Sequence, residues 1–314
     1  MFERLYLGVD IGGTDVKLGL VTEDGNVTDK ASYPVNFDGY ETPILETVLK
    51  SSRTFLSSHK DVVLMAIGVS ATGAINSREG IVAGTAGHIK NWLGSRIKDE
   101  MSAEFQAPTF VLNDANAAAL GEVWLGAAKG RQNVVVVTIG TGVGGGVIAD
   151  GHILLGRDGF AGHLGHFPIQ CEGEPCTCGN TGCLEHYASM TALVRMVKEG
   201  KEGGKLSFSP ETVNGRTIFE EAARGNEGIL SVIDRWTSYL SSGLVGFVHI
   251  FNPEMILIGG GVSAQEELFI RPVREKVMKK AMPNFSRGLS IEACRLGNEA
   301  GLVGAVYFAK QNGQ

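Results

Sequence analysis

The sequence predicts an α/β protein made of two similar lobes. Its 314 residues exceed what one hydrophobic core usually supports, so two domains or lobes are expected. A unit of strand, glycine turn and strand occurs in residues 5–26 and again in residues 134–151, and such a repeat indicates two lobes of like construction. Glycine is enriched, with 44 residues, which indicates many tight turns or close approaches of backbone to ligand.

Charge and hydropathy narrow the class of protein. The net charge is −6, from 34 acidic and 28 basic residues, which argues against an extended nucleic-acid surface. The N-terminal stretch MFERLYLGVD has no apolar run of signal length, and no window reaches the roughly 18 uninterrupted apolar residues of a membrane span. We therefore expect a cytoplasmic protein with reduced thiols and with neither a membrane nor a nucleic-acid partner.

The first glycine turn lies between two expected strands. Residues 5–10 read as a buried strand, and the turn IGGT at residues 11–14 leads into a second strand at 16–21. Backbone N–H groups in such a turn are free to face an anion. The turn is neither a Walker A loop nor a Rossmann fingerprint, because no GK[ST] signature and no following helix are present. Taken alone, it fits an ordinary hairpin turn equally well.

The second unit repeats this arrangement. In VVVVTIGTGVGGGVIADG, residues 134–151, a β-branched strand precedes the turn IGTG at 139–142, and a glycine-rich strand returns to an Asp150-Gly151 turn. Two such hairpins, one in each lobe, would present phosphate-binding turns to a shared cleft. The sequence therefore favours a phosphate-containing ligand.

Between the two units, residues 41–59 and 94–105 predict helices, while residues 62–69 and 109–112 predict strands. The second strand ends at Asn113-Asp114, and the alanine-rich stretch that follows predicts a helix over 115–128. A carboxylate at this junction is either a functional group or simply the cap of the helix.

After the second unit, helical spacing of apolar residues predicts four further helices, over 187–198, 216–249, 263–280 and 300–310. Residues 199–215 read as a solvated connection, and 255–258 as a short buried strand. The strand is followed by Gly259-Gly260-Gly261, a turn that either admits a flat ligand such as a purine or relieves crowding of the backbone.

Residues 159–187 contain four of the five cysteines. Cys176, Cys178 and Cys183 fall within eight positions, and His166 stands ten residues before the first of them. Thiolates and an imidazole on a short loop suit a tetrahedral Zn²⁺ site without an open position, which is a structural site. A disulfide is disfavoured because Cys176 and Cys178 are too close in sequence, and a buried core because the loop is polar. The remaining Cys171 and Cys294 are expected to be packing residues.

In chain order, GVDIGGT, GVSATG, VLNDANAAALGE, TIGTGVGGG, HLGH…CTCGNTGCLE and ILIGGGVS resemble the ROK family of bacterial sugar kinases along nearly the whole chain. The paired hairpins resemble the actin-like, ribonuclease-H-like ATPase fold. The resemblance implies a small lobe of residues 1–118 with the C-terminal helix 300–314, and a large lobe of residues 119–299 with the zinc loop and the adenosine site. It also implies a homodimer or tetramer.

The resemblance further implies ATP-dependent phosphorylation of a free hexose or N-acyl-hexosamine at O6, with Mg²⁺ as cofactor and Zn²⁺ as a structural ion. Asp114 matches the general base, which accepts the proton of the sugar hydroxyl. The matched sugar-binding positions are Gly73, His88, Asn113, Asp114, His163, His166 and Glu185. The matched nucleotide and Mg²⁺ positions are Asp10, Gly12, Gly13, Thr14, Lys17, Gly140, Thr141, Gly142, Gly259, Gly260 and Gly261. The implied zinc ligands are His166, Cys176, Cys178 and Cys183.

The sequence departs from the family pattern at the sugar-binding positions. His163 replaces the glutamate of the E-x-G-H motif of family glucokinases, His88 aligns with an asparagine, and Thr72-Gly73 replaces a Pro-Gly pair. Neutral histidine can both donate and accept a hydrogen bond, whereas a carboxylate only accepts. The substrate therefore stays open between N-acetylmannosamine, glucose and an unusual hexose such as allose or fructose. A sugar-sensing regulator without turnover is the alternative function.

Overall fold

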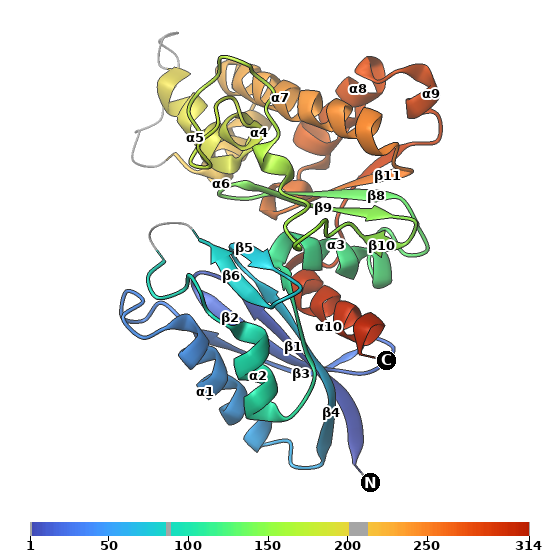
Figure 1. Ribbon diagram of the computed structural model, residues 1–314. Coiled ribbons are helices and arrows are strands. Elements are labelled where there is room, and N and C mark those ends of the chain that lie inside the picture. The colour runs from blue at the N-terminus through green and yellow to red at the C-terminus, as the bar shows by residue number, and fades with distance from the viewer. Residues whose placement is uncertain (1, 86–88, 201–212, 314) are drawn as a thin grey trace. The chain divides into compact units, whose positions relative to one another are not determined.

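The structure is a computed structural model that describes residues 2–85, 89–200 and 213–313, and it divides into two compact units. The first unit comprises Met1–Gly130, Ile153–Gly162 and Asn298–Gln314. The second unit comprises Arg131–His152 and His163–Gly297. Each unit contains its own five-stranded mixed sheet and its own hydrophobic core (Figure 1).

The sheet of the first unit has the strand order β3-β2-β1-β4-β7. Its central strand β1 (Glu3–Ile11) pairs antiparallel with β2 (Asp15–Val21) and parallel with β4 (Val62–Ala71). The edge strands are β3 (Val27–Pro34) and β7 (Thr109–Asn113). The strands expected at 5–10, 16–21, 62–69 and 109–112 are confirmed. Strand β3 was not expected, because most of its residues are polar and exposed and it carries no apolar alternation.

Helices cover both faces of this sheet. Figure 1 shows α1 (Ile44–Ser57) and α2 (Ile97–Phe105) on the face opposite α3 (Asp114–Trp124) and α10 (Ala300–Asn312). A small hairpin of β5 (Ala74–Asn76) and β6 (Ile81–Gly84) completes the unit. Helix α10 lies so close to the sheet that a Cβ at Gly68 would stand 2.1 Å from Ala305 O. The first unit is therefore closed by a segment from the far end of the chain.

The boundary between the units differs from the one expected after residue 118. That position falls inside α3, a continuous helix, and α3 packs tightly on α10, because a Cβ at Gly121 would lie 2.4 Å from Ala300 O. Such close packing keeps α3 whole within the first unit, which continues to Gly130. Residues 153–162 also belong to it.

The second sheet repeats the topology of the first. Its order is β10-β9-β8-β11-β12, in which β8 (Val134–Ile139) pairs antiparallel with β9 (Val143–Ala149) and parallel with β11 (Met255–Gly259). The edges are β10 (His152–Ile153) and β12 (Ser290–Ala293). Each sheet thus combines an antiparallel meander with added parallel strands in the same order, which confirms the repeat that the glycine turns predicted.

Two helices expected as single segments in the second unit are each broken by a cap. The stretch 187–198 is divided into α4 (Leu184–Ala188) and α5 (Met190–Glu199), because Ser189 between them is the N-cap of α5. The stretch 216–249 is divided into α6 (Gly215–Ala223) and α7 (Glu227–Phe251). There Gly225 adopts a φ of 83° and Asn226 caps α7, so a new helix begins.

Two other helix boundaries also differ from expectation. The helix expected over 263–280 begins as a 3-10 turn and a π-helix, and only α8 (Arg271–Lys280) is α-helical, followed by the short α9 (Pro283–Ser286). Helix α3 ends at Trp124, short of residue 128, because the buried carboxylate of Glu122 accepts a hydrogen bond from Ala127 N (2.8 Å) outside the helix. Most of the connection expected at 199–215 lies outside the described residues.

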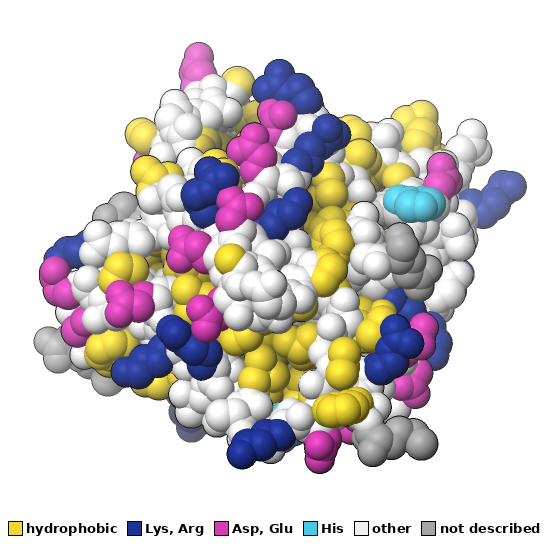
Figure 2. Space-filling model, turned by 60° about the horizontal axis from the view of Figure 1, so that its bottom comes forward, with side chains coloured by type: hydrophobic (Ala, Val, Ile, Leu, Met, Phe, Trp, Pro, Cys, Tyr) yellow, Lys and Arg dark blue, Asp and Glu magenta, His cyan; other side chains and the backbone are white. Residues whose placement is uncertain are grey.

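Charged side chains of both signs are interspersed on the face shown in Figure 2. Several form exposed ion pairs, such as Lys30 with Glu299 (2.6 Å) and Lys90 with Glu41 (2.7 Å). Exposed pairs of this kind contribute little stability. Among the described helices, none has the length and apolar character needed to cross a membrane.

Candidate active site

The first glycine turn exposes two backbone amides. Gly12 N donates to Asp15 O (2.9 Å) and closes the turn between β1 and β2. The amides of Gly13 and Thr14, in contrast, have no acceptor in the part of the chain that the structure describes. Tyr40 Oη donates to Gly13 O (2.8 Å) from the opposite side of the backbone. Two adjacent unpaired N–H groups form a site suited to an anion.

The second glycine turn is one residue shorter than the first but is built in a similar way. Gly140 N donates to Gly142 O (2.9 Å), and the amides of Thr141 and Gly142 find no acceptor within the described residues. Thr191 Oγ1 donates to Thr141 O (2.7 Å). Glu185 supports the turn, since its Oε2 accepts from Val143 N (2.9 Å). Each unit therefore presents one turn with two adjacent unpaired amides, an arrangement suited to an anion.

Asp10 lies near the carboxyl end of β1, beside the first turn. Its neighbour in the parallel sheet register is Ser70 of β4, whose buried hydroxyl donates to Asp10 Oδ1 (2.7 Å). Lys17 Nζ lies 3.3 Å from Asp10 Oδ2. A Cβ at Gly301 would come within 2.8 Å of Asp10 Oδ1, so the start of α10 also closes on this carboxylate. The carboxylate is thus fixed in direction, with oxygen atoms of the kind that Mg²⁺ prefers.

At the junction of β7 and α3, the sequence left open whether Asp114 is a functional group or the cap of the helix. Asn113, not Asp114, is the N-cap of α3, because its Oδ1 accepts from Ala115 N (3.0 Å). Its Nδ2 donates to Gly73 O (2.9 Å), which ties the helix start to the turn after β4. Gly73 has a φ of 105°, which favours glycine at this position. Asp114 is the first residue of α3, and its own Oδ1 also accepts from Ala115 N (2.8 Å).

The Asp114 carboxyl group has an unusual environment. Its side chain remains accessible to solvent, yet it is closely surrounded by protein atoms, and this limited hydration together with the nearby Asp10 charge raises the pKa of Asp114 to about 6. A hydrogen bond from Ala115 N (2.8 Å) acts in the opposite direction on the pKa. A reachable carboxylate with a pKa close to neutrality is well suited to general-base catalysis.

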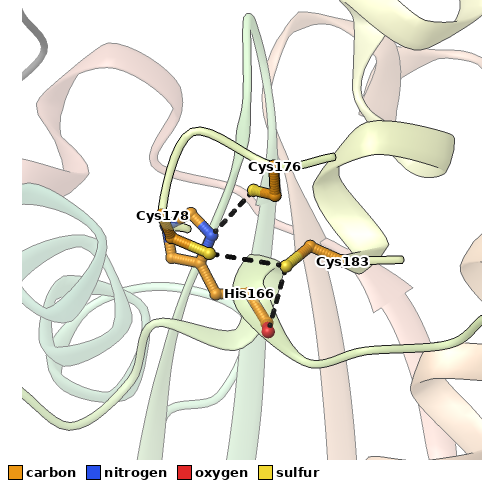
Figure 3. Close-up of side chains that lie close together, drawn as sticks. All are labelled: His166, Cys176, Cys178 and Cys183. Carbon is orange, nitrogen blue, oxygen red and sulfur yellow. Dashed lines mark hydrogen bonds between the residues drawn. The ribbon is translucent and has the colours of Figure 1, made fainter. Parts of the chain in front are cut away.

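Four side chains of the second unit converge as a candidate metal centre (Figure 3). The ligand atoms of His166, Cys176, Cys178 and Cys183 all lie within 4.8 Å of one another. Cys176 Sγ lies 3.6 Å from His166 Nδ1, and Cys178 Sγ lies 3.6 Å from Cys183 Sγ. A disulfide would need about 2.05 Å. Tetrahedral zinc with Zn–S bonds of about 2.3 Å places its ligands about 3.8 Å apart, so these residues fit a zinc ion.

His163 and Glu185 flank this cluster. The rings of His163 and His166 stack with centroids 6.1 Å apart. Burial, reinforced by His166, lowers the pKa of His163, so its imidazole is neutral near pH 7 and can donate one hydrogen bond and accept another. Glu185 follows Cys183 by two residues on α4 and reaches the second glycine turn, so a single helical turn links the cluster to that turn.

The three glycines after β11 differ in how closely other atoms surround them. A Cβ at Gly260 would lie 2.0 Å from Ile139 O, so crowding accounts for this glycine. Gly261 has open space around its Cα, as close approach of a ligand requires. Next to Gly259, Cys294 is half-buried. Cys171 is exposed, and the expectation that it is a packing residue is wrong, because the loop around it is polar and forms no core.

One predicted site residue is not described by the structure, and three supporting residues were not predicted. His88 lies outside the described residues. Tyr40, Ser70 and Thr191 support the site but were not found from the sequence. Tyr40 and Thr191 belong to no motif, and Ser70 lies within GVSATG without being singled out there; each acts through one hydrogen bond to a residue distant in the chain, which no local signal marks.

The two repeated sheets, with a glycine turn in each, define the actin-like ATPase fold. A model described as the ROK family matches residues 6–312, and the chain belongs to this family. It is 35% identical over 311 residues to a glucokinase of Thermotoga maritima, covering 97% of each chain.

Solved structures of the family agree in fold. One is a ROK family glucokinase from Streptomyces griseus in complex with glucose and AMPPNP, with a TM-score of 0.80 and 30% identity over 98% of this chain and 100% of that one. Another is a Listeria monocytogenes protein provisionally named an N-acetylmannosamine kinase, with a TM-score of 0.82 and 27% identity over 99% and 100% of the two chains.

Proposed function

We propose that this protein is an ATP-dependent sugar kinase that phosphorylates a free hexose or N-acyl-hexosamine at O6. The observation that carries the proposal is the Asp114 carboxyl group, which is accessible, has a pKa raised to about 6, and stands at the start of α3 near Asp10. Phosphoryl transfer needs positioning and charge stabilisation more than covalent help from the protein, so one well-placed base suffices.

Each unit carries groups suited to a part of the nucleotide. We assign the unpaired amides of the two glycine turns to phosphate oxygens, and the open side of Gly261 to the adenosine. Asp10, held by Ser70 and Lys17, would bind Mg²⁺, which supplies neutralisation of phosphate charge. The relative from Streptomyces griseus, whose structure contains AMPPNP, supports the use of ATP.

In the proposed reaction, Asp114 accepts the proton of the sugar hydroxyl while that oxygen attacks the γ-phosphorus, and the bond from the γ-phosphorus to the β–γ bridging oxygen breaks to release ADP. Gly73, Asn113, His163, His166 and Glu185 remain the proposed sugar contacts, together with His88. Zinc held by His166 and the three cysteines would fix the wall on which His163 stands, and it takes no part in the chemical step.

The pH dependence of the reaction follows from the raised pKa of Asp114. The base must be ionised to accept a proton, so kcat/KM is expected to rise as pH increases through about 6 and to level off above it. Initial rates for the best sugar substrate, measured between pH 5 and pH 8 at low sugar concentration, test this. A kcat/KM that is flat over this range would contradict the assignment.

For the sugar, we propose N-acetylmannosamine and glucose as the leading candidates. Similarity supports both, since one relative is a glucokinase and one related structure is provisionally named an N-acetylmannosamine kinase. A coupled ADP-release assay against glucose, mannose, N-acetylmannosamine, N-acetylglucosamine, fructose and allose tests the proposal. We expect sugar-dependent ADP release with at least one of them; none with any would favour the sugar-sensing regulator.

His163→Glu is expected to shift preference toward glucose by roughly tenfold in the ratio of kcat/KM values. Neutral His163 both donates and accepts, whereas glutamate only accepts, so the pattern of hydroxyl or acetamido groups that is bound should change. His152→Glu, an exposed site on β10, is the matched control. An unchanged sugar profile in His163→Glu would count against the specificity role.

We further propose, from the resemblance to the family, that the protein is cytoplasmic and assembles as a homodimer or tetramer. Size-exclusion chromatography with light scattering measures the assembly directly, and a monomer at micromolar concentration would exclude it.

A further inference from the structure

The two glycine turns share a feature besides their unpaired amides. In each, a side-chain hydroxyl donates to the carbonyl of the equivalent residue, which is the second after the strand. Tyr40 Oη donates to Gly13 O (2.8 Å), and Thr191 Oγ1 donates to Thr141 O (2.7 Å). The donors come from unrelated places, a loop before α1 and the first turn of α5. The same contact is thus made twice by different means.

The planar peptide group couples the direction of each held carbonyl to that of the next amide. In a trans peptide, the C=O of one residue and the N–H of the next lie in one plane and point in opposite directions. The Gly13 carbonyl therefore shares its plane with the Thr14 amide, and the Thr141 carbonyl with the Gly142 amide. Both of these amides lack an acceptor among the described residues. A hydroxyl that holds the carbonyl on one side directs the amide to the other.

We infer that Tyr40 and Thr191 are positioning residues that direct the Thr14 and Gly142 amides toward the phosphate oxygens of the nucleotide. The inference rests on the proposed nucleotide-binding function of the turns. Neither residue is placed in contact with the ligand; each acts through the backbone that it fixes.

The conformation of Tyr40 supports this role. Its φ is 65°, a left-handed conformation that is rare for a bulky aromatic residue, and its side chain is buried. Asn91, also left-handed with a φ of 54°, donates from Nδ2 to Tyr40 O (3.1 Å) and so holds this conformation. Strain of this kind persists where surrounding contacts fix it, typically at functional sites. Here it brings the phenol to the turn.

Burial does not force Thr191 to make its hydrogen bond to the second turn. Its side chain is exposed, so water would satisfy its hydroxyl equally well. The preceding Met190 N donates to Gly140 O (2.9 Å), and the start of α5 therefore holds two successive carbonyls of the turn. Because both carbonyls are held, the amide of Gly142 has a fixed direction.

Tyr40→Phe and Thr191→Val each remove one hydroxyl and retain the shape of the side chain. Binding of AMPPNP and of adenosine would be measured by calorimetry. For each variant we expect AMPPNP to bind about fivefold to tenfold more weakly, as loss of one hydrogen bond implies. Adenosine, which has no phosphate, should bind within about twofold of the parent, and the KM for sugar should not change. Tyr33→Phe and Thr54→Val are the matched controls and should bind both ligands normally.

Two comparisons, of the variants with the parent and of AMPPNP with adenosine, distinguish a failure of this inference from a failure of the proposed function. A parent protein that binds no AMPPNP would overturn the proposed function and the inference together. A parent that binds AMPPNP, with variants that bind it equally well, would overturn the inference alone. Equal losses of AMPPNP and adenosine would also overturn it, because they would indicate general damage to the nucleotide site. Loss confined to AMPPNP supports it.

Discussion

Asp114→Asn is expected to lower kcat by about 10²- to 10⁴-fold, the usual contribution of a general base. The amide has nearly the shape of the carboxylate, and its oxygen can still accept the hydrogen bond from Ala115 N. It cannot accept the proton of the sugar hydroxyl. Nucleotide binding should survive, because the assigned phosphate contacts lie in the glycine turns. Steady-state kinetics and calorimetric titration with AMPPNP measure the two effects separately.

Thermal unfolding checks that this variant is folded. The folded pKa of Asp114 lies above the ordinary value of 3.8, so the carboxyl group favours the folded state at low pH and loses that contribution as pH rises through about 6. Asp114→Asn should therefore melt no lower than the parent at pH 8. Asp99→Asn, an exposed acid in the first turn of α2, is the matched control and should retain full activity. Turnover of Asp114→Asn within roughly tenfold of the parent would defeat the base assignment.

Cys178→Ser is expected to reduce bound zinc from about one ion per chain to well below one, and to lower the melting temperature by several degrees. The loop that carries the cysteines is exposed and polar, so little besides the metal would hold it. The KM for sugar should rise, because His166 and the neighbouring His163 would lose their fixed positions. Elemental analysis, thermal unfolding and sugar kinetics test these three effects.

Loss of zinc in Cys178→Ser should also loosen the second glycine turn. Cys183 immediately precedes α4, and Glu185 on that helix accepts the hydrogen bond of Val143 N, so a disordered loop would loosen the turn and weaken ATP binding as well. Cys171→Ser is the matched control, since this exposed thiol is not one of the four ligands. Purified parent protein that contains no metal and is fully active would exclude the zinc proposal.

Much of the fold could be predicted because its main signals are local in the sequence. The β-branched strand of residues 134–139 and its glycine-rich return strand were recognised from pattern alone, and the repeat of this unit gave the two-unit architecture. Strand β3 was missed because a polar edge strand has no periodic apolar signal. The breaks at Ser189 and Gly225 were missed because apolar spacing continues across them, while one cap or one left-handed residue ends the helix.

The residues of the site divide in the same way. By itself, the sequence determined the two glycine turns and the set of four candidate zinc ligands, because in each case the groups are neighbours along the chain and their chemistry is legible from residue type. Only the tertiary structure decided that Asn113 caps α3 while Asp114 does not, that Glu185 supports the second turn, and that Tyr40 and Thr191 hold equivalent carbonyls. Those relations depend on which groups single hydrogen bonds join and in which direction, and composition and spacing determine neither.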